Sequence, residues 1–402
     1  MDKTERKMDF ISKRVQSVKP SPTLEIDAKT KILRRRGVDI ISFGTGEPDF
    51  DTPENIKSAA IAAINGGFTK YCPVSGTPEL KNAIADKLKI DNSLEYSPEE
   101  IIVSCGAKHS LYNLFQSIFD YGDEVIIPAP YWVSYPDMAI LAGAVPVIIH
   151  TDDKRGFKID PGAVRKAVTP KTKAIVINSP SNPTGAVYCP EELAEIVKVC
   201  LENNILIISD EIYEKLIYDN LKFYSTAEVL PEAKNLMVII NGVSKAFAMT
   251  GWRIGYAAGP KEIISAMTKI QSQSTSNPTS ISMKAAAEAL NGPQDAVENM
   301  RKEFEKRRDY ITERLNNIEG ISCLKPGGAF YVFPNVSKLI GKTFNGKTVN
   351  NDMDLANYLL EKAEIAVVPG SSFGTEGYLR LSYATSMELI KKGIDRLEAA
   401  VK

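Results

Sequence analysis

The stretch Ile205-Leu206-Ile207-Ile208-Ser209-Asp210 is an apolar run that ends in a carboxylate. Its near-continuous apolar character is typical of a strand that is buried on both faces of a parallel sheet. Similar short runs occur at residues 101–103, 124–128, 173–178 and 236–240, with segments of helical periodicity between them. This alternation predicts βαβ units, and therefore an α/β fold built on a mostly parallel sheet with helices on both faces.

The pattern of apolar and charged residues changes around Asn291-Gly292-Pro293. A long charged helical stretch follows at residues 298–315, and then short strand candidates at 328–333, 365–368 and 379–383 and a final helix. A chain of 402 residues is also too long for one ordinary core. We therefore expect a second, smaller α+β domain in the last quarter of the chain.

Composition excludes several classes of protein. Apolar residues make up 44% and charged residues 25%, as in ordinary soluble proteins, and 49 basic against 50 acidic residues leave no basic surplus for nucleic acid or an acidic membrane. We expect no transmembrane helix and no secretory signal. Five scattered cysteines without a Cys-x-x-Cys pair, and two histidines, argue against a metal site and favour a reducing, cytoplasmic location.

The segment Ser244-Lys245-Ala246-Phe247-Ala248-Met249-Thr250-Gly251-Trp252-Arg253 carries the strongest chemical signal. A lysine amine that forms a Schiff base and an aspartate that holds a pyridinium nitrogen are the two groups that pyridoxal phosphate chemistry needs. Asp210, at the end of a predicted strand, supplies the second group. Arg253 offers a bidentate clamp for a phosphate. Lys29 to Arg36, the densest basic run, is interpreted as the solvated face of a helix.

Together with Asn178-Ser179-Pro180-Ser181-Asn182-Pro183-Thr184-Gly185, these motifs resemble the class I, fold-type I aminotransferases that depend on pyridoxal 5'-phosphate (PLP). The resemblance covers nearly the whole chain and is closest to the bacterial subgroup Ib aspartate aminotransferases. It implies a large PLP-binding domain over residues 48–290 and a small domain formed by 1–47 with 291–402. It also implies a homodimer with composite active sites.

The resemblance assigns roles around the coenzyme ring. Lys245 is expected to bind the coenzyme covalently and, once the substrate displaces it, to act as the general base. Asp210 is expected to keep the ring nitrogen protonated. Tyr213 and Asn182 are expected to donate to the ring oxygen, and Asn182 also to face the substrate. An ordinary β-turn is the competing interpretation of the Asn-Pro-x-Gly motif alone.

Further residues are implied for the coenzyme phosphate. Gly106, Ala107 and Lys108 lie between a predicted strand and a predicted helix, where backbone N–H groups and the helix dipole attract an anion. Arg253 is expected on the same phosphate. Tyr71 resembles a tyrosine that reaches the phosphate from the neighbouring subunit, and a role as a core aromatic is an equally open alternative.

The substrate is expected to meet a second set of residues. Arg380 stands in an apolar strand-like run, and a charge there needs a partner, for which a substrate α-carboxylate is the natural choice over a structural salt bridge. Gly46 resembles the loop glycine beside that carboxylate, and Trp132 the aromatic that covers coenzyme and substrate. Lys108 is the candidate for the distal carboxylate. Lys19 is a weaker candidate for the same task, and plain surface charge competes with it.

Two positions depart from the family pattern. Gly242 occupies a position that is often serine in relatives, so one phosphate hydrogen bond could be missing, and Ala107 replaces a common glycine. The predicted function is nevertheless PLP-dependent amino transfer from L-aspartate to 2-oxoglutarate. A bifunctional aspartate/prephenate or aromatic aminotransferase of the same subgroup is the main alternative. A PLP-dependent lyase is a further alternative. We do not expect a coenzyme-binding DNA regulator, because the sequence shows no basic N-terminal domain that could bind DNA.

Overall fold

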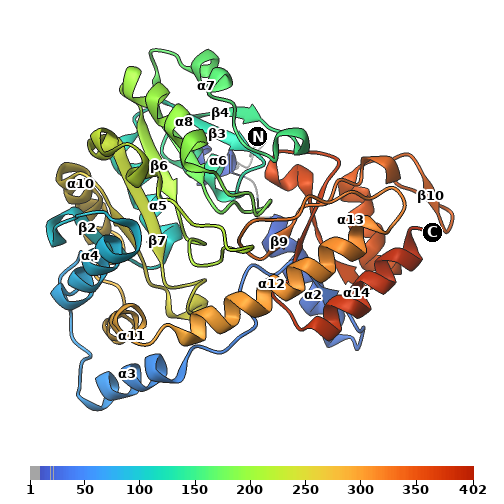
Figure 1. Ribbon diagram of the computed structural model, residues 1–402, viewed down its shortest axis with the longest axis horizontal. Coiled ribbons are helices and arrows are strands. Elements are labelled where there is room, and N and C mark those ends of the chain that lie inside the picture. The colour runs from blue at the N-terminus through green and yellow to red at the C-terminus, as the bar shows by residue number, and fades with distance from the viewer. Residues whose placement is uncertain (1–9, 19, 21) are drawn as a thin grey trace, which may run out of the picture.

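The computed structural model describes residues 10–18, 20 and 22–402. A seven-stranded sheet organises the larger part of the molecule (Figure 1), with the strand order β2-β8-β7-β6-β5-β3-β4. β8 is antiparallel to both of its neighbours, and the other four pairings are parallel. The strands are β2 (Ile101–Ser104), β3 (Glu124–Ala129), β4 (Val145–His150), β5 (Thr172–Asn178), β6 (Leu206–Asp210), β7 (Met237–Gly242) and β8 (Gly255–Ala258).

This sheet confirms the predicted α/β class, and all five apolar runs are strands. Sequence reasoning did not identify β4 or β8. β8 contains the small residues Gly255, Ala257 and Ala258. Gly255 lies close to the start of the helix that follows β2: a Cβ on this residue would lie 2.0 Å from the backbone nitrogen of Ala107. Small residues at such a close approach carry little of the hydrophobic signal by which strands are recognised.

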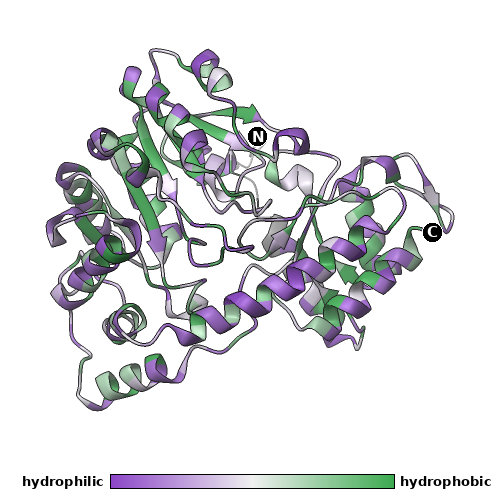
Figure 2. Ribbon diagram, viewed as in Figure 1, coloured by the Kyte–Doolittle hydropathy of each residue, from purple (hydrophilic) through white to green (hydrophobic). Residues whose placement is uncertain are grey.

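Helices cover both faces of the sheet, as expected for buried strands. One face packs against α5 (Ala107–Ile118), α6 (Ser134–Leu141) and α10 (Lys261–Ser272). The other face packs against α4 (Pro78–Asn92), α7 (Pro161–Ala167), α8 (Pro190–Glu202) and α11 (Ser280–Asn291). α3 (Glu54–Asn65) lies against α11, and the short α9 (Thr226–Val229) lies against α8. Figure 2 shows the hydrophobic residues concentrated in the central strands.

A second core lies at the other end of the molecule. It contains the three-stranded sheet β13-β14-β9, the parallel pair β1–β12 and the hairpin β10–β11. The strands are β1 (Ile41–Ser42), β9 (Tyr331–Val332), β10 (Thr343–Phe344), β11 (Lys347–Thr348), β12 (Ile365–Ala366), β13 (Val368–Pro369) and β14 (Leu379–Ser382). Its helices are α2 (Pro22–Arg35), α12 (Asp295–Asn316), α13 (Asp352–Lys362) and α14 (Met387–Ala400), and α1 (Lys13–Gln16) lies against α6 of the larger part.

Helix α12 runs from the large sheet toward this second core, where it buries Phe304 and Ile311 (Figure 1). β1 pairs with β12, so a segment near the N-terminus joins a core made mostly from the C-terminal part. We therefore keep, as a proposal, the division into residues 48–290 and residues 1–47 with 291–402. Within the described part of the chain, no helix combines the length and the apolar character that a membrane crossing requires.

Candidate active site

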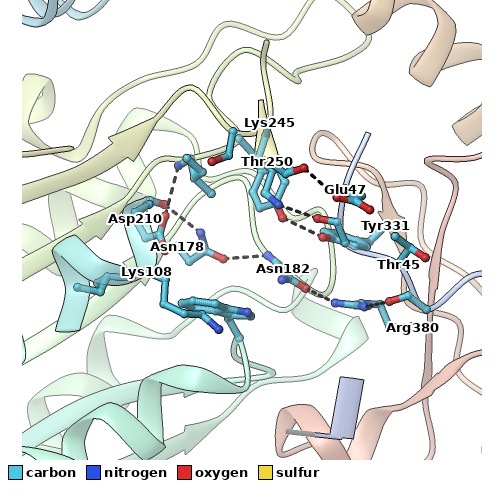
Figure 3. A pocket seen from close by; sticks show the side chains of 18 of the residues that line it. Thr45, Glu47, Lys108, Asn178, Asn182, Asp210, Lys245, Thr250, Tyr331 and Arg380 are labelled. Carbon is cyan, nitrogen blue, oxygen red and sulfur yellow. Dashed lines mark hydrogen bonds between the residues drawn. The ribbon is translucent and has the colours of Figure 1, made fainter. Parts of the chain in front are cut away.

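A cavity of about 540 Å³ lies where the carboxyl ends of β5 and β6 and the loop after β7 face the second core. Ligands of open α/β sheets bind at this edge because the strand ends leave a crevice there. Figure 3 shows side chains from both parts of the molecule converging on the cavity. Its lining includes ten of the site residues predicted from sequence: Gly46, Ala107, Lys108, Trp132, Asn182, Asp210, Tyr213, Lys245, Arg253 and Arg380.

Lys245 lies in the loop between β7 and β8. Its Nζ donates a hydrogen bond to the carbonyl oxygen of Gly46 at 2.6 Å. Burial lowers the pKa of the Lys245 amine to about 8, with Glu47 opposing this shift and Arg253 and Arg380 adding to it. A lysine with this pKa is partly uncharged near neutral pH and can act as a nucleophile or a base.

Asp210 is the last residue of β6 and is 4% exposed. Its Oδ2 accepts a hydrogen bond from the Tyr135 hydroxyl at 2.6 Å, and its Oδ1 accepts one from the backbone N–H of Ile212 at 3.3 Å. Burial raises the pKa of Asp210 to about 6, and the bond from Tyr135 opposes that rise. Burial destabilises the ionised form of this carboxylate, and a protonated ring nitrogen beside it would stabilise that form.

Asn178, at the end of β5, links Asp210 to Asn182. Its Nδ2 donates to the carbonyl oxygen of Asp210 at 2.9 Å, and its Oδ1 accepts from the backbone N–H of Asn182 at 2.8 Å. The Asn182 Oδ1 in turn accepts from Arg380, which leaves its Nδ2 as the atom that could donate to a ligand. The Tyr213 and Tyr331 hydroxyls lie 2.9 Å apart. The turn of the Asn-Pro-x-Gly motif is thus part of the cavity wall.

An anion cradle forms where β2 leads into α5. Gly106 precedes the helix with φ 92°, a conformation that favours glycine, and a Cβ there would lie 2.4 Å from Nη2 of Arg253. The first turn of α5 presents the backbone of Ala107 and Lys108 beside that guanidinium. Arg253 donates to the carbonyl oxygens of Thr250 at 2.9 Å and Cys105 at 3.2 Å, which fixes its position. This arrangement of a helix start and a guanidinium fits a phosphate.

Arg380 is the most unusual charge in the cavity. It is 3% exposed in β14, and its guanidinium lies against the rings of Tyr331 (4.6 Å) and Phe373 (5.0 Å). It donates to the Asn182 Oδ1 at 3.1 Å and the Gly44 carbonyl oxygen at 2.8 Å, whereas its Nε is buried without a partner. No carboxylate in the described part of the chain forms an ion pair with it. A buried cation in this state is suited to an incoming anion.

Other predicted residues fall in different places. Lys108 reaches over the Trp132 ring, with Nζ 4.7 Å from the centroid, and burial lowers the pKa of its amine. Tyr71 is 92% exposed, which excludes the alternative of a core aromatic and leaves the role at the neighbouring subunit's phosphate as a proposal. Lys19 lies outside the described residues. Gly44, rather than Gly46, contacts Arg380 through its carbonyl oxygen.

The departure at Gly242 has a steric explanation. A Cβ on this residue would lie 2.8 Å from the Cα of Gly255, its partner in the antiparallel pairing of β7 with β8. Ser244, two residues later, lines the cavity instead. The expectation that the Lys29–Arg36 run is a solvated helix face is incomplete, because Lys31 and Arg34 of α2 line the mouth of the cavity.

The cavity lining also contains polar residues to which sequence reasoning gave no role, among them Thr45, Glu47, Tyr135, Asn178 and Tyr331. Tyr135 stands three residues after Trp132, and Asn178 stands four residues before Asn182, so closeness in sequence to these predicted residues was an available signal. Tyr331 comes from β9, more than a hundred residues from its partner Tyr213, and no local pattern connects the two.

Comparison with known proteins gives a consistent result. Residues 38–397 match the family "aminotransferase class I and II". Aspartate aminotransferase of Bacillus sp. (strain YM-2) is 53% identical over 394 residues, covering 98% of this chain and 100% of that protein. A probable aspartate/prephenate aminotransferase of Rickettsia conorii is 53% identical over 396 residues, covering 98% and 99%.

Solved structures agree with these relatives. Aspartate aminotransferase from Rhizobium meliloti superposes with a TM-score of 0.95 at 44% identity, covering 98% of this chain and 99% of that one. The Thermus thermophilus aspartate aminotransferase with maleate gives a TM-score of 0.92 at 46% identity, covering 98% and 100%.

Proposed function

Since the chain belongs to the class I and II aminotransferases, we propose that it transfers the amino group of L-aspartate to 2-oxoglutarate with PLP as coenzyme. The products are oxaloacetate and L-glutamate. The observation that carries this proposal is the buried guanidinium of Arg380, which lies in one cavity with Lys245 and Asp210 and lacks a carboxylate partner among the described residues. A substrate α-carboxylate supplies that partner bidentately.

The donor set of the cavity fits PLP. Lys245 would hold the coenzyme covalently, Asp210 would pair with its ring nitrogen, and the cradle of Gly106 and Arg253 would hold its phosphate. Tyr213 and Asn182 would donate to the ring oxygen. When bound, PLP supplies an electron sink for the negative charge that develops at the substrate Cα.

The chain's own residues account for the remaining steps. Arg380 orients the substrate through its α-carboxylate, so that the Cα–H bond faces the amine of Lys245. That amine accepts the proton from Cα and would return it to the coenzyme carbon that receives the amino group. Its pKa of about 8 suits both halves of this transfer near neutral pH. Trp132 and Tyr135, packed edge to face at 5.3 Å, form the apolar wall that limits water beside the reacting atoms.

Lys108 is the proposed contact for the distal carboxylate of a dicarboxylic substrate. It extends over Trp132 into the same cavity as Arg380, so a short dicarboxylate could be held at both ends. The solved Thermus thermophilus relative carries maleate, a four-carbon dicarboxylate, which supports this assignment. A second activity toward prephenate is favoured by the Rickettsia relative, which is as similar as the Bacillus protein.

A homodimer is part of the proposal. Tyr71 exposes 92% of its surface, and Ile61 and Ile64 of α3 are more than half exposed, as suits a surface that a second copy covers. The partner's copy of Tyr71 could then complete the phosphate cradle. A cytoplasmic location also belongs to the proposal, supported by five cysteines that are all free thiols.

A panel of amino donors tests the substrate. The coenzyme-loaded protein is mixed in turn with aspartate, glutamate, arogenate, phenylalanine and alanine, and the absorbance change follows conversion of the coenzyme to its amino form. Rapid conversion confined to aspartate and glutamate is the expected result. Equally rapid conversion with arogenate would establish the bifunctional alternative, and conversion with none of the five would contradict the proposal.

A further inference from the structure

The charges that line the cavity are unevenly divided. The lining within the described residues contains six cationic side chains but two carboxylates, Asp210 and Glu47. The cations are Lys31, Arg34, Lys108, Lys245, Arg253 and Arg380. This surplus suits a phosphate and a dicarboxylate, but it also disfavours the charged form of Lys245. Asp210 already has a role at the coenzyme ring, so Glu47 is the carboxylate without an assignment.

Glu47 is held against the loop that carries Lys245. The preceding residue, Gly46, accepts the hydrogen bond of the Lys245 amine at 2.6 Å. The Glu47 side chain accepts at Oε2 from the Thr250 hydroxyl at 2.8 Å (Figure 3), and Thr250 lies five residues after the lysine. The backbone of Gly46 and the side chain of Glu47 are therefore both hydrogen-bonded to the loop that carries Lys245.

Thr52, five residues after Glu47, forms further hydrogen bonds to the loop that carries Lys245. Its hydroxyl donates to the carbonyl oxygen of Ala248 at 2.7 Å and accepts from the indole N–H of Trp252 at 2.9 Å. The segment from Gly44 to Thr52 is thus joined to the loop of Lys245 by several hydrogen bonds, and these hold the Glu47 carboxylate against that loop, in the lining of the same cavity.

The groups around Lys245 act in opposite directions. Burial, Arg253 and Arg380 lower the pKa of the amine, whereas Glu47 and then Asp210 raise it, with Glu47 the stronger of the two carboxylates. The rings of Tyr213 and Phe330, each 6.0 Å from Nζ, complete the surroundings. When Asp210 pairs with the coenzyme nitrogen, Glu47 is the remaining carboxylate of the cavity lining that favours the charged form of the amine.

We propose that Glu47 is a positioning residue that acts through Lys245: its carboxylate stabilises the charged form of the amine and so keeps the amine basic enough to accept the substrate proton. In that step the Cα–H bond breaks, its electron pair stays with the carbon, and the proton joins Nζ of Lys245. This inference rests on the proposed function, in which Lys245 carries the proton.

Two variants separate the charge of Glu47 from its hydrogen bond. Glu47→Gln keeps a carbonyl acceptor for Thr250 but removes the charge. Thr250→Val removes the donor and keeps the charge, so it is the matched control. The readout is the pH dependence with which a small amine-reactive reagent modifies Lys245 in the coenzyme-free protein, measured by mass spectrometry of the peptide that contains this lysine.

The charge proposal predicts that Glu47→Gln shifts the midpoint of Lys245 modification down by about 0.5 to 1 pH unit, because an opposite charge nearby favours the ammonium form. Thr250→Val should leave the midpoint within about 0.2 unit of the wild-type value. Equal midpoints in wild type and Glu47→Gln, or a shift that Thr250→Val reproduces, would overturn the proposal. Glu47→Ala serves as a second charge-removing variant if the glutamine variant does not fold.

The coenzyme-loaded protein provides an independent check. The pH profile of the half-reaction with aspartate should move in the same direction in Glu47→Gln, with the rate constant for conversion falling more than the affinity for aspartate. An unchanged profile with a weaker affinity would reduce Glu47 to a structural role. The modification experiment uses no amino donor, so it can be interpreted even if the donor panel contradicts the proposed function.

Discussion

The two walls of the cavity differ in how completely their polar groups are satisfied. On the wall formed by the large sheet, Asp210 accepts two hydrogen bonds and Asn178 connects neighbouring strand ends. On the wall formed by the second core, the Nε of Arg380 is buried without a partner. In the proposed function, the first wall would hold the coenzyme and the second would bind the substrate carboxylate.

Replacement of Lys245 by alanine should have the largest effect, because it removes both the covalent anchor and the base from the first wall. Transamination should fall by about 10⁴-fold or more, as happens when a catalytic nucleophile is lost. Turnover with aspartate and 2-oxoglutarate measures the loss, and the visible absorbance of the coenzyme shows whether the covalent attachment has disappeared. Near-normal turnover would refute the assigned mechanism.

Arg380→Leu tests the second wall and should have the next largest effect. Removal of a bidentate, buried carboxylate contact should lower kcat/KM for every amino donor by about 10² to 10³-fold, since charged hydrogen bonds in such sites each contribute about 1.5–3 kcal/mol. Coenzyme binding should be retained, because Arg380 belongs to the substrate wall. A variant that loses coenzyme as well as activity would contradict this division between the walls.

Lys108→Ala should have a smaller and selective effect. Loss of a contact with the distal carboxylate should lower kcat/KM for aspartate and glutamate about 10- to 100-fold, by the energy of one charged hydrogen bond, while alanine and phenylalanine change little. Comparison of kcat/KM across the four donors provides the measurement. An equal loss for all of them would instead assign Lys108 to the phosphate or to the packing of Trp132.

Tyr135→Phe should produce the smallest change, confined to the first wall. The hydrogen bond from Tyr135 lowers the pKa of Asp210, so its loss should raise that pKa above its present value of about 6. Asp210 must be ionised to pair with a protonated ring nitrogen. As the pH is lowered, Asp210 should therefore become protonated, and the coenzyme affinity should fall, at a higher pH in the variant than in wild type. Titration of coenzyme binding between about pH 5 and pH 8 tests this, and identical curves would show that the bond has no influence.

The fold was largely readable from the chain because burial on both faces leaves a local trace. Five strands of the large sheet were predicted from their apolar runs, but β8 was missed, since its small residues are selected by the close approach of α5 rather than by hydrophobicity. The short strands of the second core were predicted approximately, while the pairing of β1 with β12 joins residues more than three hundred positions apart. No periodicity records such a pairing.

The sequence alone determined the chemistry of the site: a lysine, an aspartate and an arginine stand in motifs whose residue types suit PLP. The tertiary structure decided which groups surround them. It placed Tyr135 on Asp210, Tyr331 against Tyr213, and Glu47 on the loop of Lys245. The physical reason is that a local sequence pattern records which face of a helix or strand is buried. The charge balance and hydrogen bonds of an active site instead depend on side chains that are distant in sequence and that only the folded chain brings together.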